Sequence, residues 1–246
     1  MLQRLRNLDR QTTLGLAMVA GALIVLAIGT AGIVFALRDD GVDLPEEGTI
    51  TEIAEQNSGE QADSLPATDV PAGPPPPAPT RMVIPSLYLD APVVVMGLTA
   101  DNQPDVPKRP DQIAWYPSFS TSPGQSSNAV FTGHVDWQTP DGMPIPGVFY
   151  RLREMRVGDL IEVTLENGEK LQYRVRANVA TEYNDPQIVQ VMQQTSKDVI
   201  TVITCGGAWL KDRRATNGGN YSHRVIVRAE RVQALAENVQ PATDDD

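Results

Sequence analysis

The clearest apolar pattern in the chain lies at Val199 to Thr204, where all residues are β-branched. Such a run is typical of a buried β-strand. It leads directly into Cys205, the only cysteine of the protein, and two glycines follow. Because glycine lets the backbone turn sharply, we expect Gly206 and Gly207 to end the strand and to leave the thiol at the open end of a sheet.

Comparable patterns of short strands recur between residues 81 and 232. The expected strands are two between Met82 and Val95, bent at prolines, then Asn128–Thr132, a hairpin of Asp159–Leu165 and Glu169–Ala180, Val199–Thr204 and Arg224–Arg231. Short helices are expected at Val148–Met155 and at Pro186–Gln194, the second with Asp185 as its N-cap. Many short strands at this spacing predict a mainly β domain, and their periodicity alone fits a closed barrel or a sandwich.

The hydropathy pattern divides the chain into five segments. Residues 1–13 carry three arginines, and residues 14–37 contain no charge, which is long enough to cross a bilayer. We expect an uncleaved transmembrane anchor with a cytoplasmic N-terminus, since the positive residues precede the span. Residues 38–80 form an acidic, Pro-rich linker that we expect to be disordered, residues 81–232 form the folded domain, and residues 233–246 form a disordered acidic tail.

Charge counted by segment changes the meaning of the net charge of −11. Residues 38–80 hold ten acidic residues and one basic residue, whereas residues 81–232 hold 16 of each sign. The acidity therefore belongs to the linker and the tail, and the domain has no basic excess that would favour nucleic acid. One cysteine and two separated histidines give no zinc-ligand spacing, and no concentrated acidic loop in the domain argues for calcium, so we expect no metal and no cofactor.

Three polar residues stand at the ends of apolar runs and carry the candidate chemistry. His134 lies in the sequence TGHVD, Cys205 closes the sequence TVITC, and Arg224 opens the strand of the sequence SHRVIV. A single cysteine is more often an inert, buried residue than a nucleophile. The company of a histidine and an arginine favours a reactive thiolate here, because both side chains can assist one.

These three motifs resemble those of the sortases, the membrane-anchored cysteine transpeptidases of Gram-positive-type cell surfaces. The resemblance covers roughly Arg81 to Val232. It implies a closed β-barrel with short connecting helices, and a catalytic set of His134, Cys205 and Arg224. The GHVD sequence and the single expected anchor look more like the smaller class D, E or F enzymes than the pilus-building class C, which favours anchoring of surface proteins over pilus polymerisation.

The resemblance also implies roles and partners. Cys205 attacks the scissile carbonyl of an LPxTG-like sorting signal, and His134 protonates the departing amine and later deprotonates the incoming one. Arg224 donates hydrogen bonds toward the substrate carbonyl or the oxyanion. The partners are then sorting-signal proteins, an amine of peptidoglycan or of a surface protein, and the membrane through residues 14–37.

Several neighbours of these residues have open roles. Asp136 either orients His134 or meets solvent, and the hydroxyl or backbone of Thr204 has a weaker claim to bind the oxyanion. Gly206 is expected to serve turn geometry and to make room for substrate. His223 competes with His134 as the base, but strand alternation points it away from the face that Arg224 occupies. Arg228 shares the parity of Arg224 and lies too far along the strand.

Two other functions fit the same residues. A cysteine protease resolves the thioester with water, and a tethered β-barrel binding domain keeps Cys205 buried and inert. The linker sequence Leu65-Pro66-Ala67-Thr68 matches the LPxT core of a sorting signal, but no apolar span or basic tail follows it, which favours coincidence. The segment from Trp209 to Tyr221 is glycine-rich and could form a mobile flap between the nucleophile and Arg224.

Overall fold

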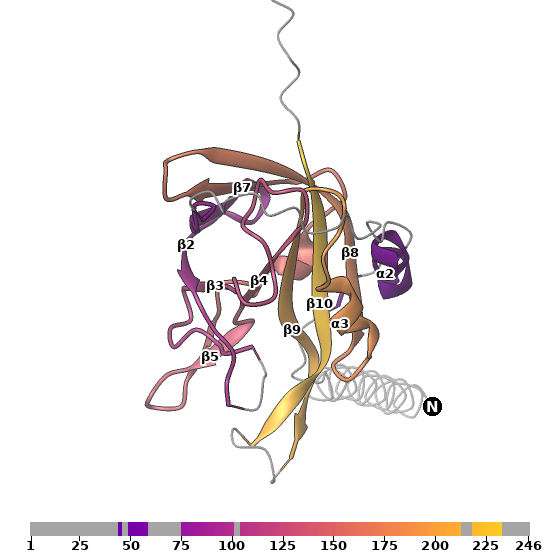
Figure 1. The fold of residues 1–246 in the computed structure, drawn as a ribbon. Helices are drawn as coiled ribbons and strands as arrows, with labels where there is room; N and C mark the ends of the chain where they lie inside the picture. The colour runs from indigo at the N-terminus through magenta and orange to yellow at the C-terminus, as the bar shows by residue number, and fades with distance from the viewer. Residues whose placement is uncertain (1–43, 46–48, 59–74, 101–103, 213–217, 233–246) are drawn as a thin grey trace, which may run out of the picture. The chain divides into compact units, whose positions relative to one another are not determined.

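A computed structural model describes residues 44–45, 49–58, 75–100, 104–212 and 218–232 of the 246-residue chain (Figure 1). Its elements are α2 (Ile50–Ser58), β1 (Pro79–Ile84), the 3-10 turn η1 (Pro85–Leu87), β2 (Leu89–Val95), β3 (Ile113–Trp115), β4 (Asn128–Gly133), β5 (Asp136–Gln138), β6 (Pro144–Pro146), the 3-10 turn η2 (Leu152–Glu154), β7 (Leu160–Leu165), β8 (Lys170–Glu182), α3 (Gln187–Val191), β9 (Val199–Lys211) and β10 (Gly219–Arg231).

Eight of the strands close into a barrel in the order β1-β2-β3-β4-β9-β10-β8-β7, so the expected closed barrel is confirmed. Neighbours pair antiparallel except β2 with β3 and β4 with β9, which run parallel. Strands β5 and β6 form a separate two-stranded sheet. The barrel interior is filled by alternate residues of its strands, among them Phe131, Val202 and Val225, together with Phe149 from the loop after β6. Closure leaves no long unpaired edge on the barrel.

The strand predictions succeed where the apolar pattern is long. Prolines bend the chain at η1 between β1 and β2, and the hairpin of β7 and β8 pairs Thr164 with Lys170 as its turn sequence predicts. The barrel begins at Pro79 rather than Arg81. The prediction for Val199 to Thr204 is wrong about where the strand ends, because β9 continues past the glycines to Lys211 and pairs with an equally extended β10.

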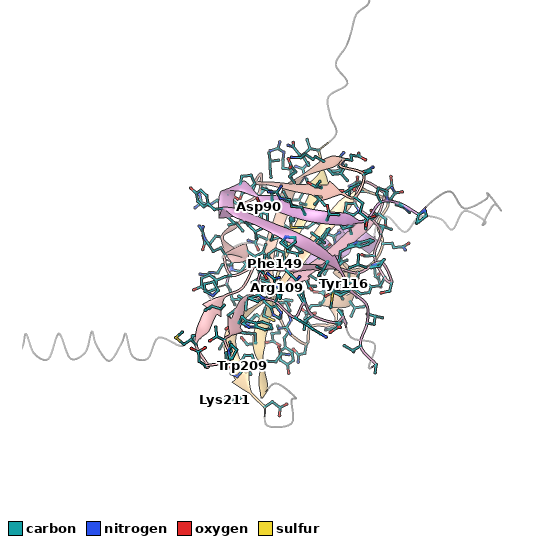
Figure 2. All side chains as sticks on the ribbon, turned by 90° about the vertical axis from the view of Figure 1, so that its left-hand side faces the viewer. Asp90, Arg109, Tyr116, Phe149, Trp209 and Lys211 are labelled. Atoms are coloured by element: carbon teal, nitrogen blue, oxygen red, sulfur yellow. The ribbon has the colours of Figure 1, made fainter. Side chains whose placement is uncertain are left out.

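The two glycines form a bulge instead of a terminus. The β9–β10 register shifts between the pairs Tyr221–Trp209 and His223–Gly206. Gly207 has a φ of +74°, and a Cβ there would overlap Ser222 Oγ and lie 2.7 Å from His223 Nδ1. Only glycine adopts this conformation at so close an approach. The hairpin therefore projects beyond the barrel body, with Trp209 and Lys211 on it (Figures 1 and 2).

Helices α2 and α3 pack on the outer face of the barrel wall that β4, β8, β9 and β10 form (Figure 1). Ile53 of α2 is fully buried in a cluster with Val130, Ile203 and Ile226 from that face. The prediction of disorder across residues 38–80 is therefore wrong for Ile50–Ser58, whose apolar side chains find partners on the barrel.

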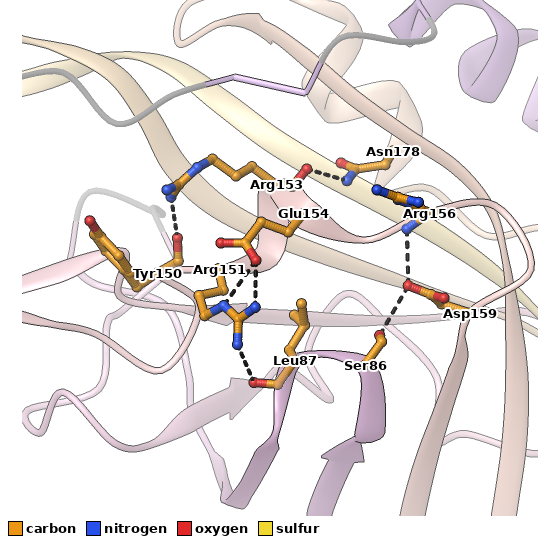
Figure 3. Close-up of polar contacts among 9 residues, drawn as sticks. All are labelled: Ser86, Leu87, Tyr150, Arg151, Arg153, Glu154, Arg156, Asp159 and Asn178. Atoms are coloured by element: carbon orange, nitrogen blue, oxygen red, sulfur yellow. Dashed lines mark hydrogen bonds and ion pairs between the residues drawn. The ribbon is translucent and has the colours of Figure 1, made fainter.

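A helix forms within the predicted range, but α3 is shorter, and Pro186 rather than Asp185 is its N-cap. Asp185 lies one residue earlier, and its Oδ1 accepts a hydrogen bond from the Gln187 backbone N–H at 2.9 Å. The helix predicted at Val148–Met155 is wrong in type, since only the 3-10 turn η2 forms there. The buried Asn178 holds this turn: its Nδ2 donates to the carbonyls of Leu152 and Met155, and to that of Arg153, the bond drawn in Figure 3. Side-chain hydrogen bonds to the backbone thus replace the regular helical ones.

Two predicted segments, the anchor at 14–37 and the tail at 233–246, lie outside the described residues. The part of the chain that the structure describes contains no helix long and apolar enough to cross a bilayer. The expected flap from Trp209 to Tyr221 is described only at its two sides, where it belongs to β9 and β10.

Candidate active site

The parallel pairing of β4 with β9 brings the histidine motif beside the cysteine motif. The register joins Thr132 to Ile203, so the residues two positions further on, His134 and Cys205, leave the wall at the same level. The hydroxyl of Thr204 donates to the carbonyl of Gly133 at 2.8 Å and ties the two strand ends together. Thr204 is buried and its hydroxyl is engaged, so it acts by positioning and its hydroxyl does not face an oxyanion.

The antiparallel pairing of β9 with β10 places Arg224 directly opposite Cys205. Residues opposite each other on adjacent strands project to the same face of the sheet. Ile203, one alternation before Cys205, packs in the outer cluster under α2 and α3. Cys205 and Arg224 therefore lie on the outer face of the barrel wall, the same face on which helices α2 and α3 pack.

Four interactions hold Arg224. Its Nη1 donates to the carbonyls of His223 at 2.9 Å and Tyr221 at 3.3 Å, and its Nη2 donates to Asn220 Oδ1 at 2.9 Å. Its guanidinium carbon lies 5.9 Å from the ring centroid of Tyr183. The fork is thereby fixed beside the thiol, which suits a group that recognises a carbonyl oxygen. Neither Asn220 nor Tyr183 was indicated by the sequence: Asn220 lies four residues before Arg224 on β10, and Tyr183 comes from a distant part of the chain.

His134 is held by a backbone carbonyl and an aromatic ring. Its Nε2 lies 2.7 Å from the carbonyl of Pro107, and because a carbonyl only accepts, Nε2 carries a proton. Trp137 packs edge-on against the imidazole with 4.8 Å between ring centroids. The nitrogen left for proton transfer is then Nδ1. Pro107 lies far before the motif, so sequence spacing gave no signal for it.

Asp136 is partly exposed to solvent, and its carboxylate bonds to a residue that the sequence did not indicate. Its Oδ2 accepts a hydrogen bond from the hydroxyl of Tyr221, which is buried on β10 and packs edge-on against Trp209 with 5.1 Å between centroids. Within the described residues Asp136 makes no hydrogen bond to His134, whose Nε2 donates to the carbonyl of Pro107 instead. Tyr221 was not singled out in the sequence, although it lies three residues before Arg224.

The glycines next to the catalytic candidates are required by packing. A Cβ on Gly133 would lie 2.6 Å from Val148 Cγ1 and 2.7 Å from the buried ring of Phe149. A Cβ on Gly206 would lie 2.9 Å from Val225 Cγ2 and 3.2 Å from Leu44 Cδ2. We expected Gly206 to make room for substrate. In the structure it makes room for the side chains of Val225 and Leu44, on the side away from the thiol.

The remaining candidates lie apart from this set. The Nδ1 of His223 is 2.8 Å from Ser222 Oγ in the bulge. Arg228 is buried and its Nη2 donates to the carbonyl of Val191 at the end of α3. That carbonyl also accepts from Asn128 Nδ2, so Arg228 belongs to the packing of the helix against the wall. Within the described ranges, no group of three His, Cys, Asp or Glu side chains could hold a metal ion.

Two groups of opposite charge affect the ionisation of the thiol. Burial raises the pKa of Cys205, the positive charge of Arg224 lowers it, and the negative charge of Asp136 raises it, with a net shift above the usual value. Burial also raises the pKa of Tyr221, and so does its hydrogen bond to Asp136. At neutral pH the site therefore holds a neutral thiol and a phenol that keeps its proton.

The raised pKa of Cys205 predicts a specific pH profile of alkylation. Since only the thiolate reacts, the rate with iodoacetamide should still be rising where a free thiol, of pKa about 8.5, has reached half its plateau. Substitution Arg224→Gln removes the charge that lowers the pKa and should move the profile to higher pH. The measurement is intact mass against time between about pH 6 and pH 10, with the urea-unfolded chain as reference. A folded-state profile at lower pH than the reference would contradict this.

Comparisons with known proteins gave one family match and several similar solved structures. A family model described as Sortase domain matches residues 82–232. Among solved structures, sortase C-1 from Actinomyces oris is 24% identical over 63% of this chain and 72% of its own, with a TM-score of 0.45. Sortase A from Corynebacterium diphtheriae is 25% identical over 66% of this chain and 64% of its own, with a TM-score of 0.43. No curated protein matches.

Proposed function

This chain belongs to the sortase family of cysteine transpeptidases, and from that premise we propose that it anchors surface proteins carrying an LPxTG-like signal to an amine of the cell envelope. The observation that carries the proposal is the convergence of three strand positions: Cys205 faces Arg224 across β9 and β10, and the Thr204–Gly133 bond brings His134 to the same level. These are the residue types that acyl transfer through a thioester needs.

In the first half-reaction the Cys205 thiol gives its proton to Nδ1 of His134, and the resulting thiolate attacks the carbonyl carbon of the scissile bond. The carbonyl oxygen becomes an oxyanion, and the guanidinium of Arg224 stabilises it with N–H donors that the contacts to Asn220 and the backbone orient. The C–N bond then breaks as protonated His134 gives its proton to the departing amine. The products are a thioacyl enzyme, a free amine and neutral His134.

In the second half-reaction an envelope amine attacks the thioester carbon. His134 takes a proton from the attacking nitrogen, the C–S bond breaks, and the thiolate of Cys205 leaves. The new bond is an amide, so the enzyme exchanges one amide for another and needs no cofactor. Water can complete the same step, which is why the outcome depends on how well the site captures the amine.

Location follows from the segment before the domain. Residues 14–37 are uncharged and follow three arginines, which supports a single-pass anchor with the N-terminus inside and the barrel outside the membrane. The GHVD sequence supports general anchoring in the manner of the class D, E or F enzymes over pilus polymerisation. A sorting enzyme held at the membrane meets its substrates as they leave it.

Intact mass spectrometry of the 246-residue chain in detergent tests the proposal. The chain is incubated with a library of LPxT-type peptides, with and without triglycine as the amine. We expect a thioacyl adduct on Cys205 that triglycine converts into amide-linked product.

The other functions give different outcomes in this assay. Peptide cleaved with equal yield of free acid, whether or not triglycine is present, identifies a cysteine protease. Absence of any adduct from every peptide identifies a tethered binding domain and overturns the proposal.

A further inference from the structure

Asp136 presents a negative charge at the thiol that the proposed chemistry leaves unexplained. It begins β5, two residues after His134, and is partly exposed. Its Oδ2 accepts from the Tyr221 hydroxyl, whereas its Oδ1 accepts no hydrogen bond from the described part of the chain. Within those residues it also forms no ion pair.

This carboxylate opposes the ionisation of the nucleophile. Its charge raises the pKa of the Cys205 thiol, against the effect of Arg224. A site that needed only a thiolate would gain from a neutral residue at this position. The negative charge of Asp136 therefore disfavours the thiolate in the first half-reaction. We look for its benefit in the second half-reaction.

The structure fixes the carboxylate firmly. The Tyr221 ring is buried and packed against Trp209, and the carbonyl of Tyr221 accepts from Arg224 Nη1. Tyr221 thus connects the arginine and the carboxylate, and holds one carboxylate oxygen while the other is free. Protein groups oriented in this way bind a charged partner with little ordering cost.

We propose that Asp136, oriented by Tyr221, is the binding site for the ammonium group of the acceptor, and that the free Oδ1 accepts its N–H. This deepens the proposed function and rests on it. Around the thioester, positive Arg224 faces the acyl oxygen and negative Asp136 faces the amine, which matches the charges of the two reactants. The chemical class of the acceptor is a primary aliphatic amine that is protonated in solution.

The acceptor ammonium loses two protons during the second half-reaction. The bound ammonium loses one proton to water and becomes the nucleophile. Its nitrogen forms the C–N bond as the C–S bond breaks, and its second proton passes to His134, which is neutral after the first half-reaction. Asp136 takes no proton and acts only by raising the occupancy of the acceptor next to the thioester.

Two nucleophiles of different charge test the proposal. Triglycine carries an ammonium group at neutral pH, whereas hydroxylamine is largely uncharged there, and both resolve a thioester. We expect Asp136→Asn to lower the ratio of kcat/KM for triglycine to that for hydroxylamine by roughly three- to tenfold, mainly through KM for triglycine. Tyr221→Phe keeps the charge but frees the carboxylate, so the ratio should fall by a smaller factor.

Asp141→Asn is the matched control. Asp141 lies in the turn between β5 and β6, is fully exposed, and has its pKa lowered by Thr139. The variant removes the same charge from the same small sheet and should leave the ratio unchanged. An Asp136→Asn ratio equal to the wild-type ratio, with thioacyl adduct still formed, would overturn the inference alone. Absence of adduct in the wild type would overturn the proposed function and this inference with it.

Discussion

Arg224→Ala should slow formation of the thioacyl adduct by about a hundredfold to a thousandfold, the loss typical of removing an oxyanion donor. Two effects act in the same direction. The guanidinium stands opposite Cys205 and lowers the pKa of its thiol, so its removal leaves less thiolate. The oriented N–H donors are lost as well, and with them the stabilisation of the tetrahedral intermediate. The measurement is the rate of adduct formation in single-turnover experiments.

One variant separates these effects, and a second serves as a control. Arg224→Lys keeps the positive charge and loses the fork, so it should recover part of the rate. Arg176→Ala removes an exposed arginine that pairs with Glu230 on the same wall, and it should leave the rate unchanged. A rate for Arg224→Ala within about threefold of wild type, less than any credible oxyanion contribution, would exclude Arg224 from the site.

Gly133→Ala should damage both stability and the position of the histidine. The new methyl group would meet Val148 and the ring of Phe149, which is fully buried and has no free space to move into. Overpacking of this kind costs about 1–3 kcal/mol. For a domain of this size we expect the Tm to fall by roughly 2–10 °C, measured by thermal unfolding.

The same substitution displaces the chain one residue before His134, so adduct formation should fall further than the loss of folded protein explains. Gly97→Ala is the matched control, because a Cβ at Gly97 meets nothing within 4 Å. Equal Tm values for the two variants would mean that the contact between Gly133 and Phe149 does not constrain the loop.

The sequence predicted those parts of the fold that depend on local patterns. A β-branched run was sufficient to predict the core of β9, and prolines to predict the bend between β1 and β2. It did not reveal α2, although Ile50, Ile53 and Ala54 have the spacing of one helix face, because the acidic and proline-rich surroundings dominate the composition. A nine-residue helix is stable there only through its contacts with the barrel.

In the candidate site, too, only the features that depend on local sequence patterns were predictable. His134, Cys205 and Arg224 stood out through motifs, and pairing across β4, β9 and β10 places them at one level. The bulge at Gly207 was not predictable, because a Gly-Gly pair is equally suited to a strand end. Which of the two forms depends on whether the partner strand continues. Contacts between residues far apart in the sequence, such as the hydrogen bond from Tyr221 to Asp136, cannot be predicted from the spacing of motifs.

Peptide mapping of the thioacyl enzyme tests directly whether Cys205 carries the acyl group. The full chain is trapped with an LPxT-type peptide at low amine concentration, digested at acid pH to preserve the thioester, and analysed beside Cys205→Ala. We expect an acyl group on the peptide that contains Cys205, and no adduct on the variant. An adduct that persists in Cys205→Ala, or peptide cleavage without any acyl-enzyme, would exclude Cys205 as the nucleophile.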